Sequence, residues 1–446
     1  MNKSLTAILI FITTWGCRQQ AQKGASFSSD AIRKVVTKMT EIMVHDVTNP
    51  PLASRFFSYA CLAGYEVIAQ NDTSCRSLHL VLNNYPQIKK PDSVQGYSYQ
   101  LAALLAIMET AKKMQPSGKL FEAFEKNFLD SCKKSGFSEE EITASKRYAL
   151  NISSQILLYA KADGYNRISN YARYTPLRDE GFWYPTPPAY IAAIEPYFKT
   201  IRPFTLDSCT QFKPPPPAPF SEDKASVFYK LMLRNYKEPL TEEHRLIAAY
   251  WDCNPFAVED KGHLLVGLKK ISPGAHWLGI TGAACTKGGK NFSEAMQIYA
   301  TVAIGLMDGF ICCWDEKYRS NRIRPETAIR KCIDPDWTPL LQTPPFPEYL
   351  SGHSTISSGS ATILTHFFGD NFHFTDSTEM PYGLAPRSFT SFHQAAKEAA
   401  ISRFYGGIHF IDAIDNGFNQ GEKVGEWVLK KAGSTIPRKD LVRKNN

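Results

Sequence analysis

The sequence lacks the patterns that mark several common protein classes. No two of its cysteines stand three positions apart, so the Cys-x-x-Cys pairs of zinc ribbons and dithiol redox enzymes are missing, and we predict no zinc site. We find no run of alternating strands joined by Asn-Gly or Asp-Gly turns, which argues against a β-hairpin architecture. No short internal repeat is visible, which argues against a solenoid or propeller.

The sequence also has only a small excess of positive over negative charge. The net charge is +8 over 446 residues, and the one dense basic cluster lies near the C-terminus, at 430–444. Because no stripe of basic and aromatic residues accompanies this charge, we predict that the protein binds no nucleic acid. Hydrophobic residues make up 43% and charged residues 21%, which is typical of a globular chain with one large domain or two to three smaller ones.

The first 27 residues have the composition of an export signal followed by a tether. A mostly apolar run from Leu5 to Thr14 is too short to span a bilayer as a stable helix. Trp15-Gly16-Cys17 then places a small residue before a cysteine, which resembles a bacterial lipoprotein signal, although Thr14 stands where that motif prefers leucine. We predict a signal peptide over 1–16, lipid on Cys17 and a tether over 17–27.

An ordinary secretory signal with cleavage nearby is the alternative interpretation of this segment. Both interpretations predict an exported protein, either periplasmic or an outer-membrane lipoprotein. The only membrane attachment that we predict is the N-terminal lipid. Nine cysteines follow Cys17, and an exported protein is able to form disulfides. Nine is an odd number, however, and we interpret Cys312 and Cys313, which lie in an apolar helical stretch, as small core residues.

Apolar residues recur at helical spacing over most of the chain, which predicts a mainly α fold. Ser138 and Glu141 form a potential capping box at the start of one long helix. The other predicted helices cover 31–44, 52–69, 97–114, 224–234, 242–252 and 292–317, and further ones begin near His353, Arg387 and Ile411. Proline and aromatic residues are dense over 165–220, so we predict an ordered, irregular segment there. It separates an N-terminal helical region, 28–215, from a C-terminal one, 216–446.

The first of three candidate site motifs is Lys317, followed after six residues by Arg324-Pro325. Lys317 falls near the end of the long apolar helix, and the proline keeps Arg324 in an extended conformation after it. Taken alone, such a pair is typical of solvated surface charges. Only together with the other two motifs does this pair become a candidate for binding an oxyanion.

The second motif, Ser351-Gly352-His353, precedes an apolar helix rich in serine and threonine. The first amides of a helix are unpaired and the helix dipole is positive there, so this position favours an anion. The third motif has Arg403 near a helix end and then His409, with five residues between them that include two glycines. An arginine fork pairs well with oxyanions, and a neutral histidine nitrogen is able to attack phosphorus or bind a metal.

Together these motifs, in this order and spacing, resemble the superfamily of vanadium-dependent haloperoxidases and type 2 phosphatidic acid phosphatases. The stretches Trp-Tyr-Pro-Thr-Pro-Pro and Pro-Phe-Pro-Glu-Tyr look like those of bacterial members described as vanadium haloperoxidases. The resemblance implies a helical-bundle fold of the vanadium haloperoxidase and acid phosphatase type. It covers 290–430 most clearly and extends over most of the mature chain.

The resemblance also implies a role for each matching residue. His353 would be the acid–base group, and His409 would bind vanadium or, in a phosphatase, attack phosphorus. Trp314 and Phe346 match the places where haloperoxidases put aromatic residues beside the halide. The vanadate or phosphate oxygens would be bound by Lys317, Arg324, Ser351, Gly352 and Arg403.

Two positions depart from the family pattern. Leu350 stands where a proline usually precedes Ser-Gly-His. Family members often have an aspartate four residues after the last histidine, where it orients the imidazole, but here that residue is Ala413, flanked by Asp412 and Asp415. The residue that orients His409 is therefore not identified by the sequence.

Three functions remain open at this point. The leading one is a vanadate-dependent haloperoxidase that oxidises halide with hydrogen peroxide to hypohalous acid, using vanadate as cofactor and no heme. The alternative is a cofactor-free phosphatase that hydrolyses phosphate esters through a phosphohistidine. A lipoprotein that only binds an oxyanion is the third, although binding alone needs neither His353 nor His409.

Overall fold

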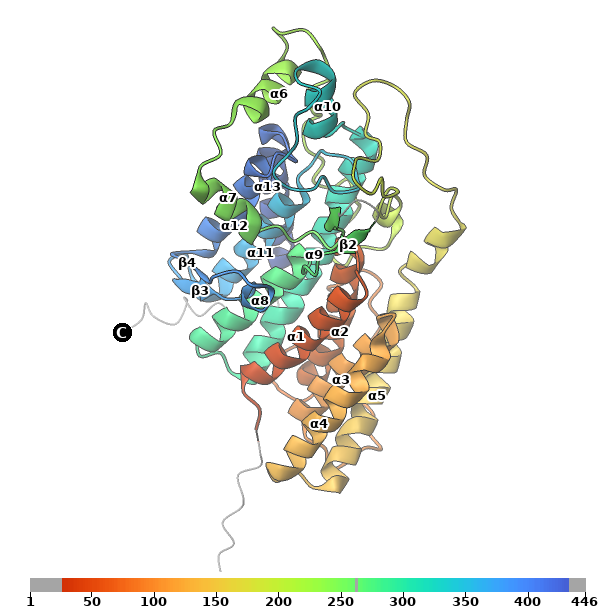
Figure 1. The fold of residues 1–446 in the computed structure, drawn as a ribbon. Coiled ribbons are helices and arrows are strands. Elements are labelled where there is room, and N and C mark those ends of the chain that lie inside the picture. Colours follow the sequence, from red (N-terminus) through yellow and green to blue (C-terminus); the bar gives the residue numbers. More distant parts are fainter. Residues whose placement is uncertain (1–25, 261–263, 433–446) are drawn as a thin grey trace, which may run out of the picture.

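The computed structural model describes residues 26–260 and 264–432, and over this part the chain is mainly α-helical, as the sequence predicts (Figure 1). The predicted signal peptide, Cys17 and most of the tether lie outside the described residues. Two short antiparallel pairs of strands are the exceptions to the helical pattern. β1 (Val258–Asp260) pairs with β2 (Leu265–Gly267), and β3 (Phe374–Asp376) pairs with β4 (Arg387–Phe389).

The first five helices lie together at one end of the molecule, drawn in red to yellow in Figure 1. They are α1 (Ser29–His45), α2 (Pro50–Ala69), α3 (Tyr99–Met114), α4 (Phe121–Lys134) and α5 (Glu139–Lys161). Four were predicted, and α4 was not. Asn49 caps α2 by accepting from Leu52 N, and Pro50 and Pro51 occupy its first positions. The Asn-Pro-Pro stretch therefore begins α2, whereas α1 has already ended at His45.

The central element is α9 (Phe292–Ser320), which passes between α2 and the C-terminal helices (Figure 1). Asn291 and Glu294 form a full capping box at its start. By length and composition α9 could cross a bilayer, but 94% of its most apolar 18-residue window is buried inside the fold. We therefore describe α9 as a core helix, and it ends at the first of the candidate site motifs.

The remaining helices surround α9 or cap one end of the molecule, as Figure 1 shows. They are α6 (Val227–Lys237), α7 (Glu242–Tyr250), α8 (Pro273–Lys287), α10 (Pro325–Cys332), α11 (Gly352–Phe368), α12 (Phe392–Tyr405) and α13 (Ile411–Ala432), with short 3-10 turns at Gly118–Leu120, Tyr165–Asn170, Phe198–Thr200 and Met380–Tyr382. The helix predicted to begin near Arg387 begins at Phe392 instead. Arg387 belongs to β4, because Arg387–Phe389 pairs with Phe374–Asp376 and Ser391 caps the helix that follows.

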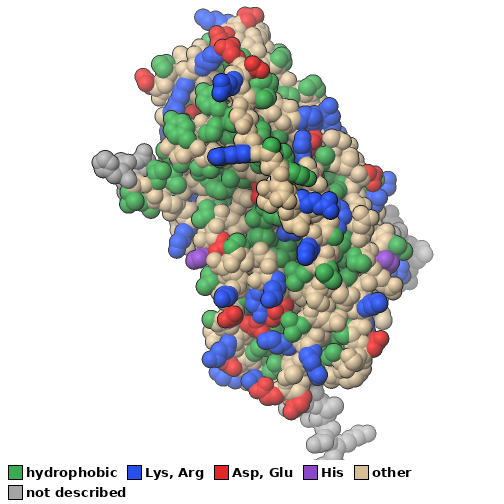
Figure 2. All heavy atoms as spheres, turned by 90° about the vertical axis from the view of Figure 1, so that its right-hand side faces the viewer, with side chains coloured by type: hydrophobic (Ala, Val, Ile, Leu, Met, Phe, Trp, Pro, Cys, Tyr) green, Lys and Arg blue, Asp and Glu red, His purple; other side chains and the backbone are tan. Residues whose placement is uncertain are grey.

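One hydrophobic cluster extends from Ala31 to Ala432 and includes buried residues on both sides of position 215. The division into two helical regions stays a prediction. On the face drawn in Figure 2, Lys and Arg side chains are interspersed with Asp, Glu and apolar groups. No basic stripe crosses that face.

The irregular segment predicted over 165–220 is fastened to α9 by Asp308. This carboxylate is fully buried and accepts hydrogen bonds from Phe204 N at 2.7 Å, Thr205 N at 2.8 Å and Thr205 Oγ1 at 2.6 Å. Burial raises the pKa of Asp308 to about 6, although the three donors oppose that rise. This buried acid thus binds the segment to the helix that leads to the site, together with Trp314 and Tyr318, which both donate to Ile194 O.

Asp308→Ala is expected to lower the free energy of unfolding by about 2–5 kcal/mol, because two buried backbone N–H groups lose their acceptor. Urea unfolding followed by circular dichroism measures this change. Asp308→Asn keeps one acceptor oxygen and is the matched control, with a smaller expected loss. A loss below about 1 kcal/mol in Asp308→Ala would show that the segment is held by its other contacts.

Candidate active site

The three motifs converge where α9 ends and α11 begins. Lys317 lies in the last turn of α9, and Arg324 occupies the extended position before α10, with φ −81° and ψ 154°, as its proline neighbour predicts. Ser351 is the N-cap of α11, and its hydroxyl accepts from Ser354 N at 3.3 Å. His409 follows α12 after the turn in which Gly407 adopts a positive φ of 72°.

Arg324 is completely buried and reaches across to the third motif. Its Nε donates to Phe346 O at 2.9 Å, and its Nη1 lies 2.9 Å from Ile408 O and 3.1 Å from His409 Nε2. Its Nη2 has no hydrogen-bond partner among the described residues. Arginine keeps its charge even when buried, so a fixed cation with one free N–H group lies beside His409.

Lys317 is used differently from the other cations. Its ammonium donates to three carbonyls, Pro347 O at 3.0 Å, Glu348 O at 3.1 Å and Leu350 O. Burial, followed by the nearby arginines, lowers its pKa to about 7. Three carbonyl acceptors nevertheless require three N–H donors, which only the charged ammonium has. The predicted contact between Lys317 and an oxyanion stays a prediction, because in this structure the ammonium holds the loop before Ser351.

Glu348, in the same loop, is the residue that orients His409. Its Oε1 accepts from His409 Nδ1 and from Phe410 N, both at 2.9 Å, and its Oε2 accepts from Arg322 Nε at 2.6 Å. Asp412, which the sequence placed near His409, pairs instead with Arg322, at 2.6 and 2.8 Å. Carboxylate–imidazole pairs of this kind fix the tautomer and the ring orientation of a ligand histidine.

The two histidines are both neutral, and each has one ring nitrogen with a lone pair, which in His409 accepts from Arg324 Nη1 at 3.1 Å. Burial and then Arg324 hold the pKa of His409 well below its usual range, and because its Nδ1 donates to Glu348, its Nε2 carries the lone pair. Burial and then Arg403 lower the pKa of His353 in the same way. His353 also bonds to the backbone of Trp251, and since its Nε2 has no partner among the described residues, that bond involves Nδ1.

Arg403 is held by the segment that joins α7 to β1, which the sequence analysis did not single out. Its Nη1 donates to Trp251 O and its Nη2 lies 3.5 Å from Asp252 Oδ1. Its Nε has no partner among the described residues. The wall segment, residues 251–257, therefore fixes the guanidinium and leaves one N–H group available.

A cavity of about 30 Å³ lies between these groups. Gly352, His353, Arg403 and His409 reach it, whereas Lys317, Arg324 and Ser351 lie behind its surface. The other lining residues are Pro50, Cys253, Asn254, Pro255, Phe256, Pro273, Phe310, Trp314, Pro344, Phe346 and Ile408. Arg324 Nη2 and Arg403 Nε are buried near it without partners among the described residues, which is unusual for a protein interior. These two cationic N–H groups suit an oxyanion with several acceptor oxygens.

The predicted aromatic pair also lines this cavity. Trp314 and Phe346 have their ring centroids 5.0 Å apart, and Phe310 lies 5.2 Å from Trp314 on the other side. Trp314 Nε1 donates to Ile194 O at 3.2 Å, so the indole presents only carbon atoms to the cavity. One wall of the site is thus apolar and polarizable, and Lys317 and Arg324 lie over the Phe346 ring at 5.0 and 5.1 Å from its centroid.

A second buried cluster adjoins the wall segment. His276 Nε2 lies 2.6 Å from Asp376, and its Nδ1 lies 3.4 Å from Cys253 Sγ and 3.2 Å from Glu379. Burial disfavours the imidazolium, but Asp376 outweighs it and raises the pKa of His276 well above its usual range. Cys253, His276 and Glu379 could together hold a metal ion. The prediction that the protein has no zinc site therefore stays a prediction.

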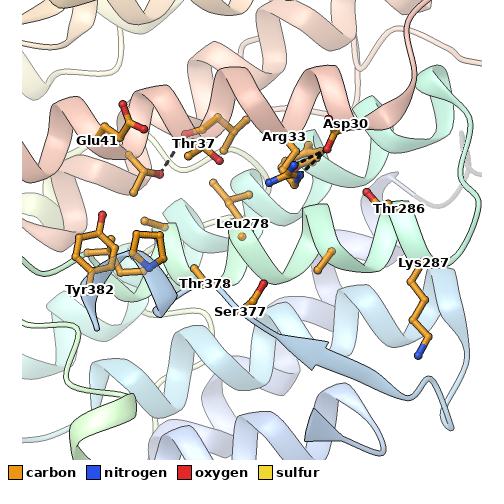
Figure 3. Close-up of a pocket in the computed structure, with 18 residues that line it drawn as sticks. Asp30, Arg33, Thr37, Glu41, Leu278, Thr286, Lys287, Ser377, Thr378 and Tyr382 are labelled. Atoms are coloured by element: carbon orange, nitrogen blue, oxygen red, sulfur yellow. Dashed lines mark hydrogen bonds and ion pairs between the residues drawn. The ribbon is translucent and has the colours of Figure 1, made fainter. Parts of the chain in front are cut away.

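A larger cavity, of about 550 Å³, lies elsewhere, between α1, α8 and residues 377–382 (Figure 3). Figure 3 shows Thr37 and Glu41 on α1, Leu278 on α8, and Thr378 and Tyr382 on the third side. It contains none of the predicted site residues. Choosing the active site by cavity volume alone would therefore miss the residues of the three sequence motifs.

Comparisons with known proteins concern the family and the fold of this chain. The family model described as the VCPO second helical-bundle domain matches residues 297–437. The crystal structure titled as the first bacterial vanadium-dependent iodoperoxidase matches with a TM-score of 0.86 and 42% identity, and the match covers 91% of this chain and 97% of that one. A search among curated proteins found no match.

Two more distant structures share the fold. A holo-type bacterial vanadium-dependent chloroperoxidase matches with a TM-score of 0.62 and 14% identity, over 87% of this chain and 94% of that one. Its apo-type counterpart matches with a TM-score of 0.64 and 15% identity, over 87% and 96%. At this identity the likeness concerns the fold alone.

Proposed function

Because the chain belongs to the family of vanadium-dependent haloperoxidases, we propose that it uses hydrogen peroxide to oxidise halide and that iodide is its preferred substrate. Membership of the family makes it a peroxidase-class enzyme whose cofactor is vanadium. One observation supports both the preference for iodide and the roles of the residues: buried donors without partners among the described residues face an aromatic wall.

The residues of this chain fit vanadate. Arg324 Nη2 and Arg403 Nε would bind two oxygens of the anion, and the backbone amide of Gly352 at the start of α11 would bind another. His409 Nε2, whose lone pair accepts from Arg324 Nη1 in this structure, would bind the metal. Lys317 orders the loop before the site through its three carbonyl bonds, and Ser351 caps α11, so both residues position the groups that bind the anion. Bound vanadate supplies Lewis acidity that activates peroxide toward attack by halide, without a change of oxidation state.

The protein's own share of the reaction is to position groups, exclude water and move a proton. Glu348 holds His409 in one tautomer, so its Nε2 is always presented to the metal position. His353 Nε2 is neutral and unpartnered, so it is able to accept a proton from peroxide and return it to the leaving oxygen. The buried guanidinium groups stabilise negative charge that develops between them.

The aromatic wall supports iodide over the smaller halides. Trp314, Phe346, Phe310 and Phe256 surround a narrow cavity with ring carbons. Iodide is the largest, most polarizable and most weakly hydrated of the three halides, so it loses least when water is removed. The iodoperoxidase that matches at 42% identity points the same way.

The test is a halide assay on protein reconstituted with orthovanadate and supplied with hydrogen peroxide. We expect oxidation that depends on vanadate, with kcat/KM highest for iodide, lower for bromide and lowest for chloride. Absence of turnover with all three halides would contradict the proposal. Hydrolysis of a phosphate ester by the vanadate-free protein would instead favour the phosphatase alternative, which shares the same oxyanion-binding groups.

We also propose that the protein is exported and held at a membrane by lipid on Cys17. The support is the sequence Trp15-Gly16-Cys17 after an apolar run, together with the polar residues that follow it. This location would place the enzyme where peroxide and halide arrive from outside the cytoplasm.

A further inference from the structure

Asn254 carries a buried amide on the wall of the active-site cavity that the fold leaves without a partner. The residue is 4% exposed and lines the cavity. Its Oδ1 accepts from Phe256 N at 3.1 Å, which fixes the orientation of the amide. Its Nδ2 makes no hydrogen bond within the described part of the chain. A buried amide that lacks a partner is unfavourable, so a ligand that accepts from it would remove that cost.

The other side-chain donors around the cavity are already used. Trp314 Nε1 donates to Ile194 O, and the Cys253 thiol lies 3.7 Å from its acceptor, Glu379 Oε1. His409 Nδ1 donates to Glu348, and His353 presents a ring nitrogen with a lone pair, not a proton. The free N–H groups of the arginines are cationic and suit the oxyanion. Among the described lining side chains, Asn254 Nδ2 is the neutral donor left over.

We propose that the amide Nδ2 of Asn254 is the hydrogen-bond donor that holds the halide in this cavity, an inference that rests on the proposed haloperoxidase function. A halide that enters a cavity lined by rings and prolines loses its water, and it needs at least one donor in return. A neutral amide holds a monovalent anion less tightly than a guanidinium does, so the halide is able to leave this donor when it is oxidised to hypohalous acid. The aromatic wall then contacts the remaining surface of the halide.

The wall segment explains why the amide is placed so firmly. Arg403 donates to Trp251 O, and Cys253 N donates to the same carbonyl at 2.8 Å. Asn254 O accepts from Ala257 N at 3.1 Å, which closes a turn directly before β1. One arginine therefore serves the oxyanion through Nε and positions the halide donor through its other nitrogens.

Asn254→Asp is the most direct test, because the carboxylate still accepts from Phe256 N but no longer donates. We expect the KM for iodide to rise by about ten- to a hundredfold at neutral pH. The assays use saturating vanadate, because the new carboxylate also repels the oxyanion in the same cavity, and the kcat at saturating iodide should then stay within about twofold. In acid the carboxyl gains a proton and is again able to donate, so the KM of this variant alone should fall back toward the wild-type value.

Asn254→Ser is the second variant, since a hydroxyl both accepts and donates, and it should give an intermediate KM. Asn291→Asp is the matched control, because Asn291 Oδ1 also accepts from a backbone amide, Glu294 N at 2.9 Å, but lies at the start of α9 away from the cavity. An unchanged iodide KM in folded Asn254→Asp would overturn the proposal. So would a weaker Kd for vanadate with unchanged KM, which would assign the amide to the oxyanion.

The proposal can fail independently of the proposed function. Turnover by the wild-type enzyme with any halide tests the haloperoxidase assignment. Calorimetric titration of the vanadate-loaded protein with iodide tests the amide without turnover. Binding by the wild type that is at least about tenfold weaker in Asn254→Asp supports the role of Asn254, and equal binding by both proteins contradicts it.

Discussion

Glu348→Ala is expected to lower the free energy of unfolding by about 3–5 kcal/mol, the largest stability effect that we expect from a single site residue. The carboxylate is fully buried and accepts from His409 Nδ1, Phe410 N and Arg322 Nε. Its removal leaves a buried backbone amide without an acceptor and removes one of the two anions that balance Arg322. Chemical unfolding at neutral pH measures the loss.

Glu348→Gln separates the two roles of this side chain. It keeps an acceptor oxygen for His409 and Phe410 but loses the negative charge, so it should fold with a smaller loss of stability. Because the carboxylate sets the orientation and basicity of His409, we expect the Kd for vanadate to rise by about 10–100-fold in this variant. Wild-type affinity in Glu348→Gln would show that the carboxylate is structural only.

His409→Ala is expected to lower kcat/KM for iodide by more than about 100-fold. Loss of an outer residue such as Glu348 typically costs 10–100-fold, and His409 is the group proposed to bind the metal itself. The ring also accepts from Arg324 Nη1 at 3.1 Å, so its loss frees a second cationic N–H group. Steady-state assays with saturating vanadate measure the change, and circular dichroism establishes that the variant is folded.

His366→Ala is the control for this prediction, because His366 lies in α11 but does not line the cavity. We expect it to keep wild-type kcat/KM. If His409→Ala retained more than about a tenth of wild-type activity, the metal would have to be held by another residue. Phosphate ester hydrolysis that disappears in the same variant would instead indicate a phosphohistidine.

The main parts of the site could be predicted because their signals are local. Arg324 is extended since a proline follows it, and Ser351 begins a helix since its hydroxyl caps the helix amides. The spacing of the motifs along α9, α11 and α12 then indicated that they act together. The long helices were predictable for the same reason, because their apolar residues repeat along one face.

Other parts depend on contacts between distant residues, which no local pattern records. Glu348 belongs to the Pro-Phe-Pro-Glu-Tyr stretch, but its role depends on how that loop packs against His409, 61 positions later. Arg403 and Trp251 are separated by 152 positions. The helix expected near Arg387 was displaced by strand pairing with β3. By contrast, the start of α8 does have a local signal in the sequence, because the cap Ser272 is followed by Pro273 at the first helical position.

The carbonyl groups around Lys317 and Arg324 have a consequence for how the cofactor is loaded. Phe346, Pro347, Glu348 and Leu350 all direct carbonyl oxygens at these two cations, so the loop is already ordered by the protein alone. The entropy of arranging the site is lost during folding and not when the anion arrives. Vanadate should therefore bind to and dissociate from a site that is already ordered. Phosphate, which has the same shape, should compete with vanadate in direct proportion to its concentration.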